Sequence, residues 1–390
     1  MNQAINDLME LLPIPGQPSQ EAQIAAEIYD KLITMGVPAD NISYDNAQDQ
    51  SEYGGEIGNM IVHLGGQSDQ PHLMFSTHMD TVPIAVGCQP RLDTGQKRIV
   101  NDAEGCALGG DNRAGCAVLL HLARELLALK GEHPPTTLVF FVQEEVGLVG
   151  ARGLDLALLG EPIPMMCFNW DGRHSDQFVV AVTGTERFTI DVSGIASHAG
   201  ASPEDGLSAA VITSHAIAEL DRNGWTGRIE KDGKIGSANV GIMNGGQGSN
   251  VVMPDMNILA EARSHDPAFR KQIIETWQDA FAKAVKSCSN HLGEKGSVMF
   301  GPGPTYESFA LDENEPTVQR ILAATATCDI DAKLVSNDGG MDANWIVAHG
   351  IPAVTIGVGQ RFVHRPEEWI DLDDFENACR LAVAIATLAT

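Results

Sequence analysis

Hydrophobic residues between positions 60 and 142 form two patterns: short continuous runs and a longer helical repeat. Runs typical of buried strands cover residues 60–64, 72–76 and 136–142, and the last is rich in β-branched and aromatic residues. Between the second and third runs, RAGCAVLLHLARELLALKG (113–131) predicts a long helix with one apolar face that stops at Gly131. Alternating strands and helices predict an α/β layer with a largely parallel sheet.

The pattern changes near Gly184, where apolar and polar residues begin to alternate. Strand and helix patterns then follow in the order β-α-β-β-α-β, and the earlier style resumes from about residue 311. We expect a larger domain of residues 1–181 and 302–390, with an inserted domain of residues 182–301. The predicted fold class is α/β, with a mixed, mostly parallel sheet flanked by helices. The insertion is a smaller α+β unit with an antiparallel sheet and two helices.

Composition and charge narrow the possible partners. A chain of 390 residues exceeds what one core usually supports, which agrees with two domains. The formal net charge of −27 opposes attraction to phosphate backbones and anionic lipid, so we expect neither nucleic acid nor membrane as a partner. The first residues lack the pattern of an export signal, and the seven cysteines form no C-x-x-C pair. These features favour a cytoplasmic protein with reduced thiols.

Candidate chemistry first occurs at two predicted loop positions. His78 and Asp80, in FSTHMDTVP, lie at the end of a buried strand, and their side chains point to the same side of the chain. One can therefore bind a metal while the other fixes the orientation of the imidazole. Asp111, in LGGDNRAG, lies just before a helix. Each signal is weak alone, because His78 and Asp80 also fit a polar loop and Asp111 also fits an N-cap.

A stronger signal follows the third strand. FFVQEEVGLVG ends a very apolar run with Glu144 and Glu145, whose side chains point in opposite directions if the strand continues. One carboxylate can then bind a cation while the other moves a proton. The alternative is a solvated loop after a strand.

Asp171 in CFNWDGR and His364 in GVGQRFVHRPEEW complete the set, although a lone histidine is more often structural. Two histidines and three carboxylates at strand-end loops, with one further glutamate, fit two divalent ions that share a bridging carboxylate. The absence of cysteine from the set favours a catalytic site over a structural zinc site.

The sequence resembles the aminoacylase and carboxypeptidase family of dizinc hydrolases, and most closely its peptidase T branch. The likeness extends over nearly the whole chain, through STHMDTV, GGDNRAG, QEEVGLVGA, SHAG, GGQGSN, ILAEARS, GGMDAN and HRPEE. The resemblance implies two divalent ions, zinc above all, with cobalt or manganese as alternatives.

The resemblance also assigns roles. His78 and Asp171 would hold one ion, Glu145 and His364 the other, and Asp111 would bridge them. Asp80 would steady His78, and Glu144 would be the general base.

In the inserted domain, expected to serve as lid and dimerisation domain, three residues match family positions, and Gly340 of the larger domain matches another. His198 resembles the histidine that reaches into the partner subunit's site and polarises the scissile carbonyl, which implies a homodimer. Asn250 and Arg263 match residues that bind the substrate main chain and its terminal carboxylate, although a surface salt bridge is an equal alternative for Arg263. Gly340 matches a loop beside the metals, where a glycine lets the backbone approach the ligand closely.

The leading hypothesis is therefore a metallo-aminopeptidase that hydrolyses short peptides such as tripeptides. An N-acyl-amino-acid deacylase or a metallocarboxypeptidase on the same site is the alternative enzyme. A metal-loaded binding protein without catalysis is a third hypothesis, which the extra carboxylate of Glu144 disfavours.

Overall fold

The computed structural model describes residues 1–388, apart from the side chain of Pro304. Tertiary contacts divide the chain into two compact units. The first unit comprises Met1–Ala181, Ala310–Asn337 and the residues from Met341 onward, and the second comprises Val182–Phe309 and Asp338–Gly340. The inserted residues thus form a core of their own.

A nine-stranded mixed sheet forms the centre of the first unit, with β1-β2-β6-β3-β7-β16-β8-β14 in spatial order and β15 paired to β8. β3 runs parallel to β6 and β7, and β16 runs parallel to β7, so the middle of the sheet is parallel. Its strands are β1 Ile42–Tyr44, β2 Met60–Leu64, β3 Leu73–His78, β6 Thr136–Phe141, β7 Met166–Gly172, β8 Gln177–Val182, β14 Phe309–Ala310, β15 Lys333–Asn337 and β16 Ala353–Gly357. Every residue of β3 and β6 is buried, which explains their continuous apolar runs.

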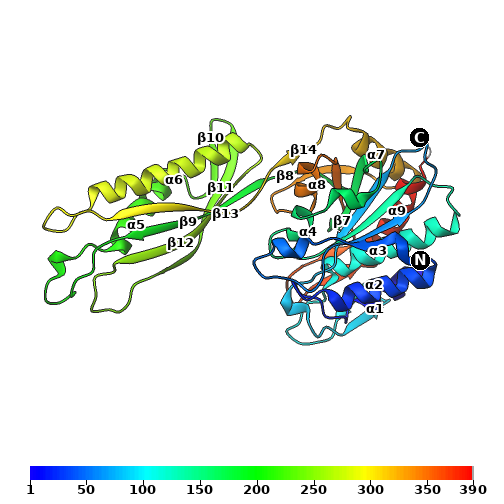
Figure 1. Ribbon diagram of the computed structural model, residues 1–390, viewed down its shortest axis with the longest axis horizontal. Helices are drawn as coiled ribbons and strands as arrows, with labels where there is room; N and C mark the ends of the chain where they lie inside the picture. Colours follow the sequence, from blue (N-terminus) through cyan, green and yellow to red (C-terminus); the bar gives the residue numbers. More distant parts are fainter. Residues whose placement is uncertain (389–390) are drawn as a thin grey trace. The chain divides into compact units, whose positions relative to one another are not determined.

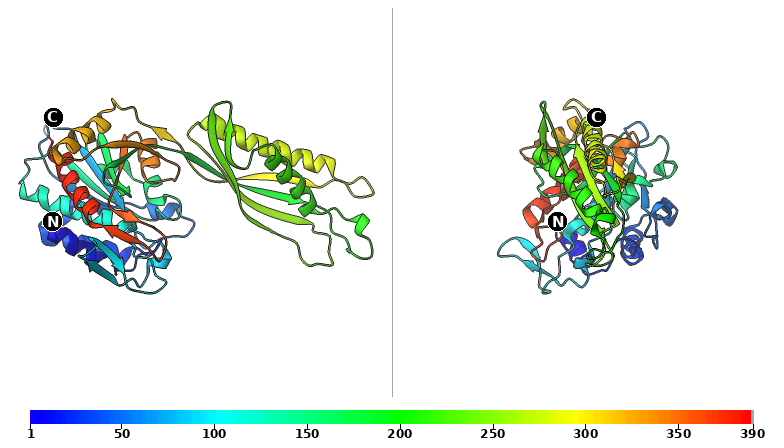
Figure 2. Two further views of the ribbon diagram at one scale, coloured as in Figure 1. Left: turned by 180° about the vertical axis from the view of Figure 1, so that it is seen from behind. Right: turned by 90° about the vertical axis from the view of Figure 1, so that its left-hand side faces the viewer.

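Helices cover this sheet, as Figures 1 and 2 show. The helix α3 packs against β3 and β7, and α1, α2 and α9 pack around it. The helices are α1 Asn2–Leu11, α2 Ala22–Met35, α3 Gly110–Ala128, α4 Val149–Arg152, α7 Pro316–Cys328, α8 Ala343–Ala348 and α9 Leu372–Thr387. These contacts make α3 a central element, and its first turn lies beside the candidate site. The predicted fold class is confirmed.

A second, four-stranded sheet in the first unit was not expected from the sequence. Its order is β17-β18-β5-β4, with β4 Pro90–Asp93, β5 Arg98–Asn101, β17 Gln360–Arg361 and β18 Trp369–Asp371. These strands have two to four residues each and few apolar positions, so they leave little periodicity to detect. The loop between β17 and β18 carries His364.

The second unit is a five-stranded antiparallel sheet, ordered β10-β11-β12-β9-β13, with two helices packed on it. The elements are β9 Gly184–Ser193, α5 Ala209–Arg222, β10 Gly227–Lys231, β11 Lys234–Gly245, β12 Asp255–Ser264, α6 Pro267–Ser287 and β13 Ser297–Tyr306. Phe188, Trp277 and Phe281 are central to its core. The strand β10 adds one member to the predicted order. It is a largely exposed edge strand that pairs only with β11, through a tight turn at Asp232 and Gly233.

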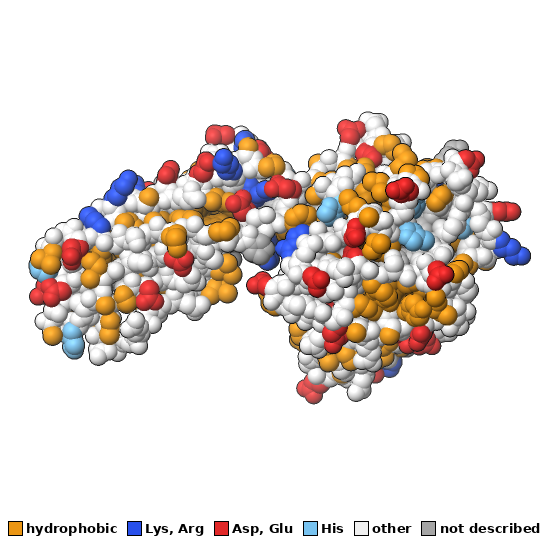
Figure 3. All heavy atoms as spheres, in the orientation of Figure 1, with side chains coloured by type: hydrophobic (Ala, Val, Ile, Leu, Met, Phe, Trp, Pro, Cys, Tyr) orange, Lys and Arg blue, Asp and Glu red, His pale blue; other side chains and the backbone are white. Residues whose placement is uncertain are grey.

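No helix among residues 1–388 is both long and apolar enough to span a lipid bilayer. On the face drawn in Figure 3, acidic side chains of each unit are scattered rather than gathered in one patch. The acidic side chains on this face thus form no single acidic patch.

Candidate metal centre

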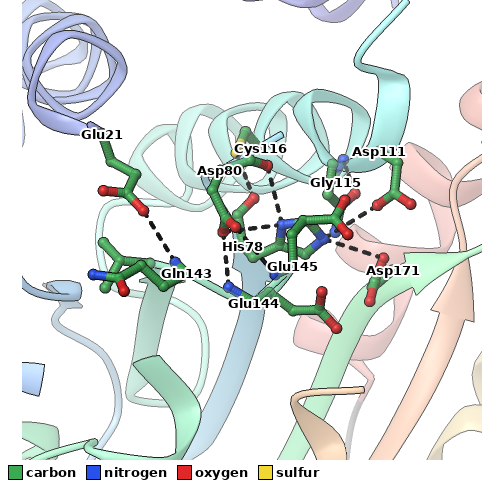
Figure 4. Close-up of polar contacts among 12 residues, drawn as sticks. Glu21, His78, Asp80, Asp111, Gly115, Cys116, Gln143, Glu144, Glu145 and Asp171 are labelled. Carbon is green, nitrogen blue, oxygen red and sulfur yellow. Dashed lines mark hydrogen bonds and ion pairs between the residues drawn. The ribbon is translucent and has the colours of Figure 1, made fainter. Parts of the chain in front are cut away.

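Three neighbouring parallel strands bring candidate residues to one edge of the large sheet. His78 is the last residue of β3, Glu144 and Glu145 follow the end of β6, and Asp171 is near the end of β7. Because parallel strands end at the same edge, these side chains converge there. Figure 4 shows the imidazole of His78 lying among the carboxyl groups.

The two ring nitrogens of His78 have different partners. Nδ1 lies 3.1 Å from the main-chain oxygen of Asp80 and 3.4 Å from Oδ1 of the same residue. Both oxygens are acceptors, so Nδ1 carries hydrogen. Nε2 faces Oδ1 of Asp111 at 3.1 Å and Oδ1 of Asp171 at 3.6 Å. In the neutral ring Nε2 therefore presents its lone pair to the space between two carboxylates, as a metal ligand does.

A second histidine closes the other side of the cluster. Nε2 of His364 lies 2.9 Å from Oε1 of Glu145 and 3.3 Å from Oδ2 of Asp111. The two oxygens of Asp111 thus face different histidines, Oδ1 toward His78 and Oδ2 toward His364. This is the geometry of a carboxylate shared by two ions.

The ligand atoms form three overlapping groups, and within each group they all lie within 4.8 Å of one another. The groups are His78, Asp111 and Asp171; Asp111, Glu145 and His364; and His78, Glu144 and Glu145. Only oxygen and imidazole nitrogen donors take part, a set that suits zinc, cobalt or manganese. When both imidazoles are neutral, two divalent cations would offset the negative charge of the four largely buried carboxyl groups. The residues therefore fit a two-metal centre.

Burial also shifts the acidity of these groups. Burial raises the pKa of Glu144 well above its usual value, and Asp171 and Glu145 add to this effect against the opposing influence of His78. Burial, together with Asp111, raises the pKa of Glu145 to about 7, although His364 opposes it. Burial in itself lowers the pKa of His78, but hydrogen bonds to Asp111, Asp171 and Asp80 outweigh it and raise that pKa well above its ordinary value. Carboxyls in such surroundings can exchange protons near neutral pH.

The carboxylate of Asp80 fixes the backbone of the two glutamates. Glu144 N–H donates to Oδ1 at 3.0 Å and Glu145 N–H donates to Oδ2 at 3.1 Å. Since Asp80 also contacts Nδ1 of His78, one fully buried side chain orients both the histidine and the paired glutamates.

Asp111 does not cap helix α3. Its φ and ψ of −84° and 101° are extended, and the side chain of Asn112 instead accepts from Gly115 N–H at 3.0 Å. The capping role that Asp111 could have played thus belongs to Asn112, which leaves the carboxylate of Asp111 facing the histidines.

Two residues that were not expected from the sequence, Gln360 and Glu368, contact this cluster, and a third, Glu21, contacts the residue before Glu144. The amide nitrogen of the buried Gln360 donates to Oδ1 of Asp111 at 3.3 Å and to Oδ1 of Asn112 at 3.1 Å. Glu21, buried at the start of α2, accepts from Gln143 N–H at 3.1 Å, and Glu368 contacts the loop of Asp111. The sequence signal for Glu368 was faint, because it lies in HRPEE, where His364 alone was assigned a role.

The sequence matches the model of peptidase family M20/M25/M40 over residues 74–388. The chain belongs to this family. The solved structure of aminopeptidase PepT from Bacillus cereus ATCC 10987 matches with a TM-score of 0.84 and 28% identity, covering 99% of this chain and 98% of its own. The structure of a tripeptidase from Staphylococcus aureus subsp. aureus Mu50 has a TM-score of 0.87 and 26% identity over the same shares.

Curated relatives extend the comparison. The uncharacterized protein YqjE of Bacillus subtilis (strain 168) is 29% identical over 381 residues, which are 98% of this chain and 96% of YqjE. A succinyl-diaminopimelate desuccinylase of Corynebacterium glutamicum is 26% identical over 388 residues, covering 92% of this chain and 89% of the relative. The predicted resemblance is thus confirmed: the protein is a hydrolase of peptidase family M20, with aminopeptidase and tripeptidase structures among its neighbours.

The other predicted residues of this M20 chain lie in its second unit. His198 is exposed in the loop after β9, and its Nδ1 accepts from Gly200 N–H at 3.1 Å and Ala201 N–H at 3.0 Å. Its Nε2 therefore carries the hydrogen in the neutral ring and can donate it. Asn250 is exposed on the adjacent loop, and its main-chain oxygen accepts from Ala199 N–H at 2.9 Å. The second unit thus brings these two residues together.

Arg263 and Gly340 have partners within the same unit. Nε and Nη2 of Arg263 donate to the two carboxylate oxygens of Glu261 at 2.9 and 3.2 Å, which is the salt bridge weighed against substrate binding. Nη1 donates to the main-chain oxygen of Asp338 at 3.0 Å. At Gly340, an added Cβ would lie 2.4 Å from the phenol oxygen of Tyr306, so the close packing of that ring requires a glycine.

Proposed function

We propose that this M20 hydrolase is a di-metal aminopeptidase that cleaves short peptides, tripeptides above all. The proposal rests mainly on one observation, the placement of Asp111 between His78 and His364. This placement turns two histidine–carboxylate groups into one site with a shared ligand. His78 and Asp171 would hold one ion, and Glu145 and His364 the other. Zinc is the first choice, with cobalt or manganese as alternatives.

When bound, two such cations would polarise the peptide carbonyl and make a shared water acidic. Glu144 supplies the proton transfers. Its carboxylate takes a proton from the attacking water as the new C–O bond forms, and it returns that proton to the nitrogen as the C–N bond breaks. The products are a carboxylic acid and an amine, which become a carboxylate and an ammonium group when the acid passes its proton to the amine, so atoms and charges balance. Burial, which raises the pKa of Glu144, favours this alternation between acid and base.

Asp80 prepares this step without touching the substrate. It holds the main chain of Glu144 and Glu145 and orients the imidazole of His78. The ligands and the base therefore start from fixed positions, which reduces the entropy that must be lost during the reaction.

The choice of an aminopeptidase draws on relatives that align over almost the full chain. The Bacillus cereus and Staphylococcus aureus structures carry the names aminopeptidase and tripeptidase, and each is more than 25% identical to this chain. The similar desuccinylase of Corynebacterium glutamicum supports a second candidate, an N-acyl-amino-acid deacylase. A metallocarboxypeptidase that uses the same site is the other alternative enzyme.

The proposal includes a homodimer. The resemblance assigns to His198 the polarisation of the scissile carbonyl from a second subunit, and the Nε2–H of its neutral ring is a suitable donor. His198→Ala should then lower kcat, and a mixture of His198→Ala and Glu144→Gln chains should regain part of the activity in mixed dimers.

A substrate comparison tests the proposed function. Zinc-loaded protein is given a tripeptide with a free amino terminus, the same tripeptide N-acetylated, and an N-succinyl amino acid, and the products are identified by mass spectrometry. We expect release of the first residue from the free tripeptide and little turnover of the other two. Exclusive cleavage of an acylated substrate would replace the aminopeptidase by a deacylase, and release of the last residue would replace it by a carboxypeptidase.

A further inference from the structure

The carboxylate of Glu368 holds the loop that carries Asp111. Gly109 N–H donates to Oε2 at 2.9 Å and Asp111 N–H donates to Oε1 at 3.0 Å. Glu368 is only 2% exposed, so water does not compete for either bond. Carboxylate acceptors of main-chain N–H groups form strong, charge-assisted hydrogen bonds. Both oxygens of this buried side chain are thus committed to one short stretch of backbone.

The close fit at Gly110 supports the same conclusion. A Cβ at Gly110 would lie 2.5 Å from Cδ1 of Ile370 and 3.2 Å from Oε1 of Glu368. A larger residue at this position would have to displace the side chain of Ile370 and crowd Glu368, so glycine suits the close approach of the loop to β18 and the glutamate. The residues of GGD (109–111) therefore both begin α3 and bind the side chain of Glu368.

Glu368 shares its loop with a candidate metal ligand. His364 lies four residues earlier between β17 and β18, and Glu368 N–H closes a turn onto the main-chain oxygen of Arg365 at 3.0 Å. The loop thus contacts Asp111 twice, through the ring of His364 at the carboxylate and through Glu368 at the main chain. These contacts fix Asp111 from both ends.

Asp80 makes the same kind of contact with another loop of the site. There, one buried carboxylate accepts from two main-chain N–H groups of the loop that carries Glu144 and Glu145. Glu368 does this for the loop of Asp111, yet it belongs to none of the ligand groups found among the described residues. Its oxygens face the backbone rather than the space between the histidines.

We infer that Glu368 is a positioning residue that sets the orientation of Asp111 and thereby the affinity of the site for both cations. The inference rests on the proposed function, because it assumes that Asp111 bridges two ions. A residue that orients a metal ligand typically changes metal affinity or activity by about 10- to 100-fold when it is replaced. Since the bridging carboxylate contacts both ions, loss of Glu368 weakens binding of both.

Two variants and one control separate positioning from mere stability. Glu368→Gln keeps the size of the side chain but replaces one acceptor oxygen by an NH2 group that opposes a main-chain N–H. Glu368→Ala removes both acceptors. Glu367→Gln changes the adjacent, exposed carboxylate by the same chemistry and serves as the matched control.

The experiment measures zinc stoichiometry and dissociation constants by competition with a chelator, together with the melting temperature of metal-free and zinc-loaded protein. We expect Glu368→Gln to weaken zinc binding by about 10- to 100-fold and to shrink the increase in melting temperature that zinc produces. At saturating zinc, kcat should fall while KM stays within about twofold. The control should match the wild type.

Other outcomes have distinct meanings. If Glu368→Gln and Glu368→Ala bind zinc as tightly as the wild type, the inference is overturned. This holds even if both variants have lower melting temperatures, because an equal decrease in the metal-free and the zinc-loaded protein indicates a purely structural role. If Glu368→Ala does not fold, the Gln variant alone decides. A wild-type protein that binds zinc at fewer than two sites would overturn the proposed function first, and the inference with it.

Discussion

Nε2 of His364 lies 2.9 Å from Oε1 of Glu145, although the two residues are 219 positions apart in the chain. The β17–β18 loop carries the histidine, and the loop after β6 carries the glutamate. Without a cation this contact needs a proton on the ring. Hydrogen bonds to Asp111 and Glu145 accordingly raise the pKa of His364 to about 10. A divalent cation held by these two side chains would take the place of that proton.

Metal binding should therefore release protons. In the metal-free protein, His364 with its raised pKa is charged at pH 7, whereas a metal ligand must be the neutral ring. Zinc affinity should then rise with pH and fall as the solution becomes more acidic. Calorimetric titration of zinc at pH 7, in two buffers with different ionisation enthalpies, measures the protons released. Heats that are independent of the buffer would contradict this prediction.

Replacing Glu144 should separate catalysis from metal binding. We expect Glu144→Gln to keep two zinc ions per chain while kcat falls by a factor on the order of 10² or more, because the amide cannot accept the proton of the attacking water. Peptide turnover and metal analysis on the same preparation provide the measurement. Glu132→Gln, at an exposed glutamate, is the control. Unchanged kcat in Glu144→Gln would remove this residue as the base.

Loss of Asp80 should affect both ligands and base. Asp80→Ala leaves the N–H groups of Glu144 and Glu145 without their acceptor. It also removes the carboxylate beside Nδ1 of His78, so that the main-chain oxygen of residue 80 alone orients the ring from this side. We expect zinc affinity and kcat each to fall by about 10- to 100-fold. Chelator competition and steady-state kinetics measure these changes. If Asp80→Ala kept both values, the orientation of the cluster would depend on other contacts.

The predictable part of the fold came from patterns within short segments. The apolar run of residues 60–64 became β2, and the run of 136–142 became β6, because strands buried on both faces carry apolar residues at every position. Strand ends in a parallel sheet share one edge, which is why His78, Glu144 and Asp171 were singled out together. The tally of two histidines and three carboxylates then added Asp111 and His364, and the family resemblance assigned the roles.

The unpredicted part depends on contacts between distant segments. Short, polar strands such as β4 and β17 are specified by pairing with partners rather than by their own periodicity. Gln360 and Glu368 act on Asp111 from about 250 residues away through an amide and a carboxylate that any surface loop could contain. No local pattern distinguishes such residues from solvated ones.

Glu21 should make the stability of the metal-free protein depend on pH. Burial, with the nearby charge of Asp80, raises the pKa of Glu21 from 4.5 to about 8. The folded state therefore binds more protons than the unfolded state between these values, and stability falls as pH rises through this window. The slope approaches about 1.4 kcal/mol per pH unit from this group alone.

Glu21→Gln should remove that dependence while keeping one acceptor oxygen for the N–H groups of Ser19 and Gln143. Urea unfolding of metal-free wild type and variant at several pH values from 5 to 8 is the measurement. We expect the free energy of unfolding of the variant to increase steadily relative to that of the wild type as the pH rises toward 8. A constant difference between the two proteins across this range would contradict the prediction.

The most direct test of the two-metal centre is zinc stoichiometry in Asp111→Ala beside the wild type, determined by elemental analysis after dialysis against metal-free buffer. The account predicts two zinc ions per wild-type chain and loss of most of this zinc in the variant, because the shared ligand is gone while His78 and His364 remain. Two ions retained by Asp111→Ala, or none bound by the wild type, would contradict it.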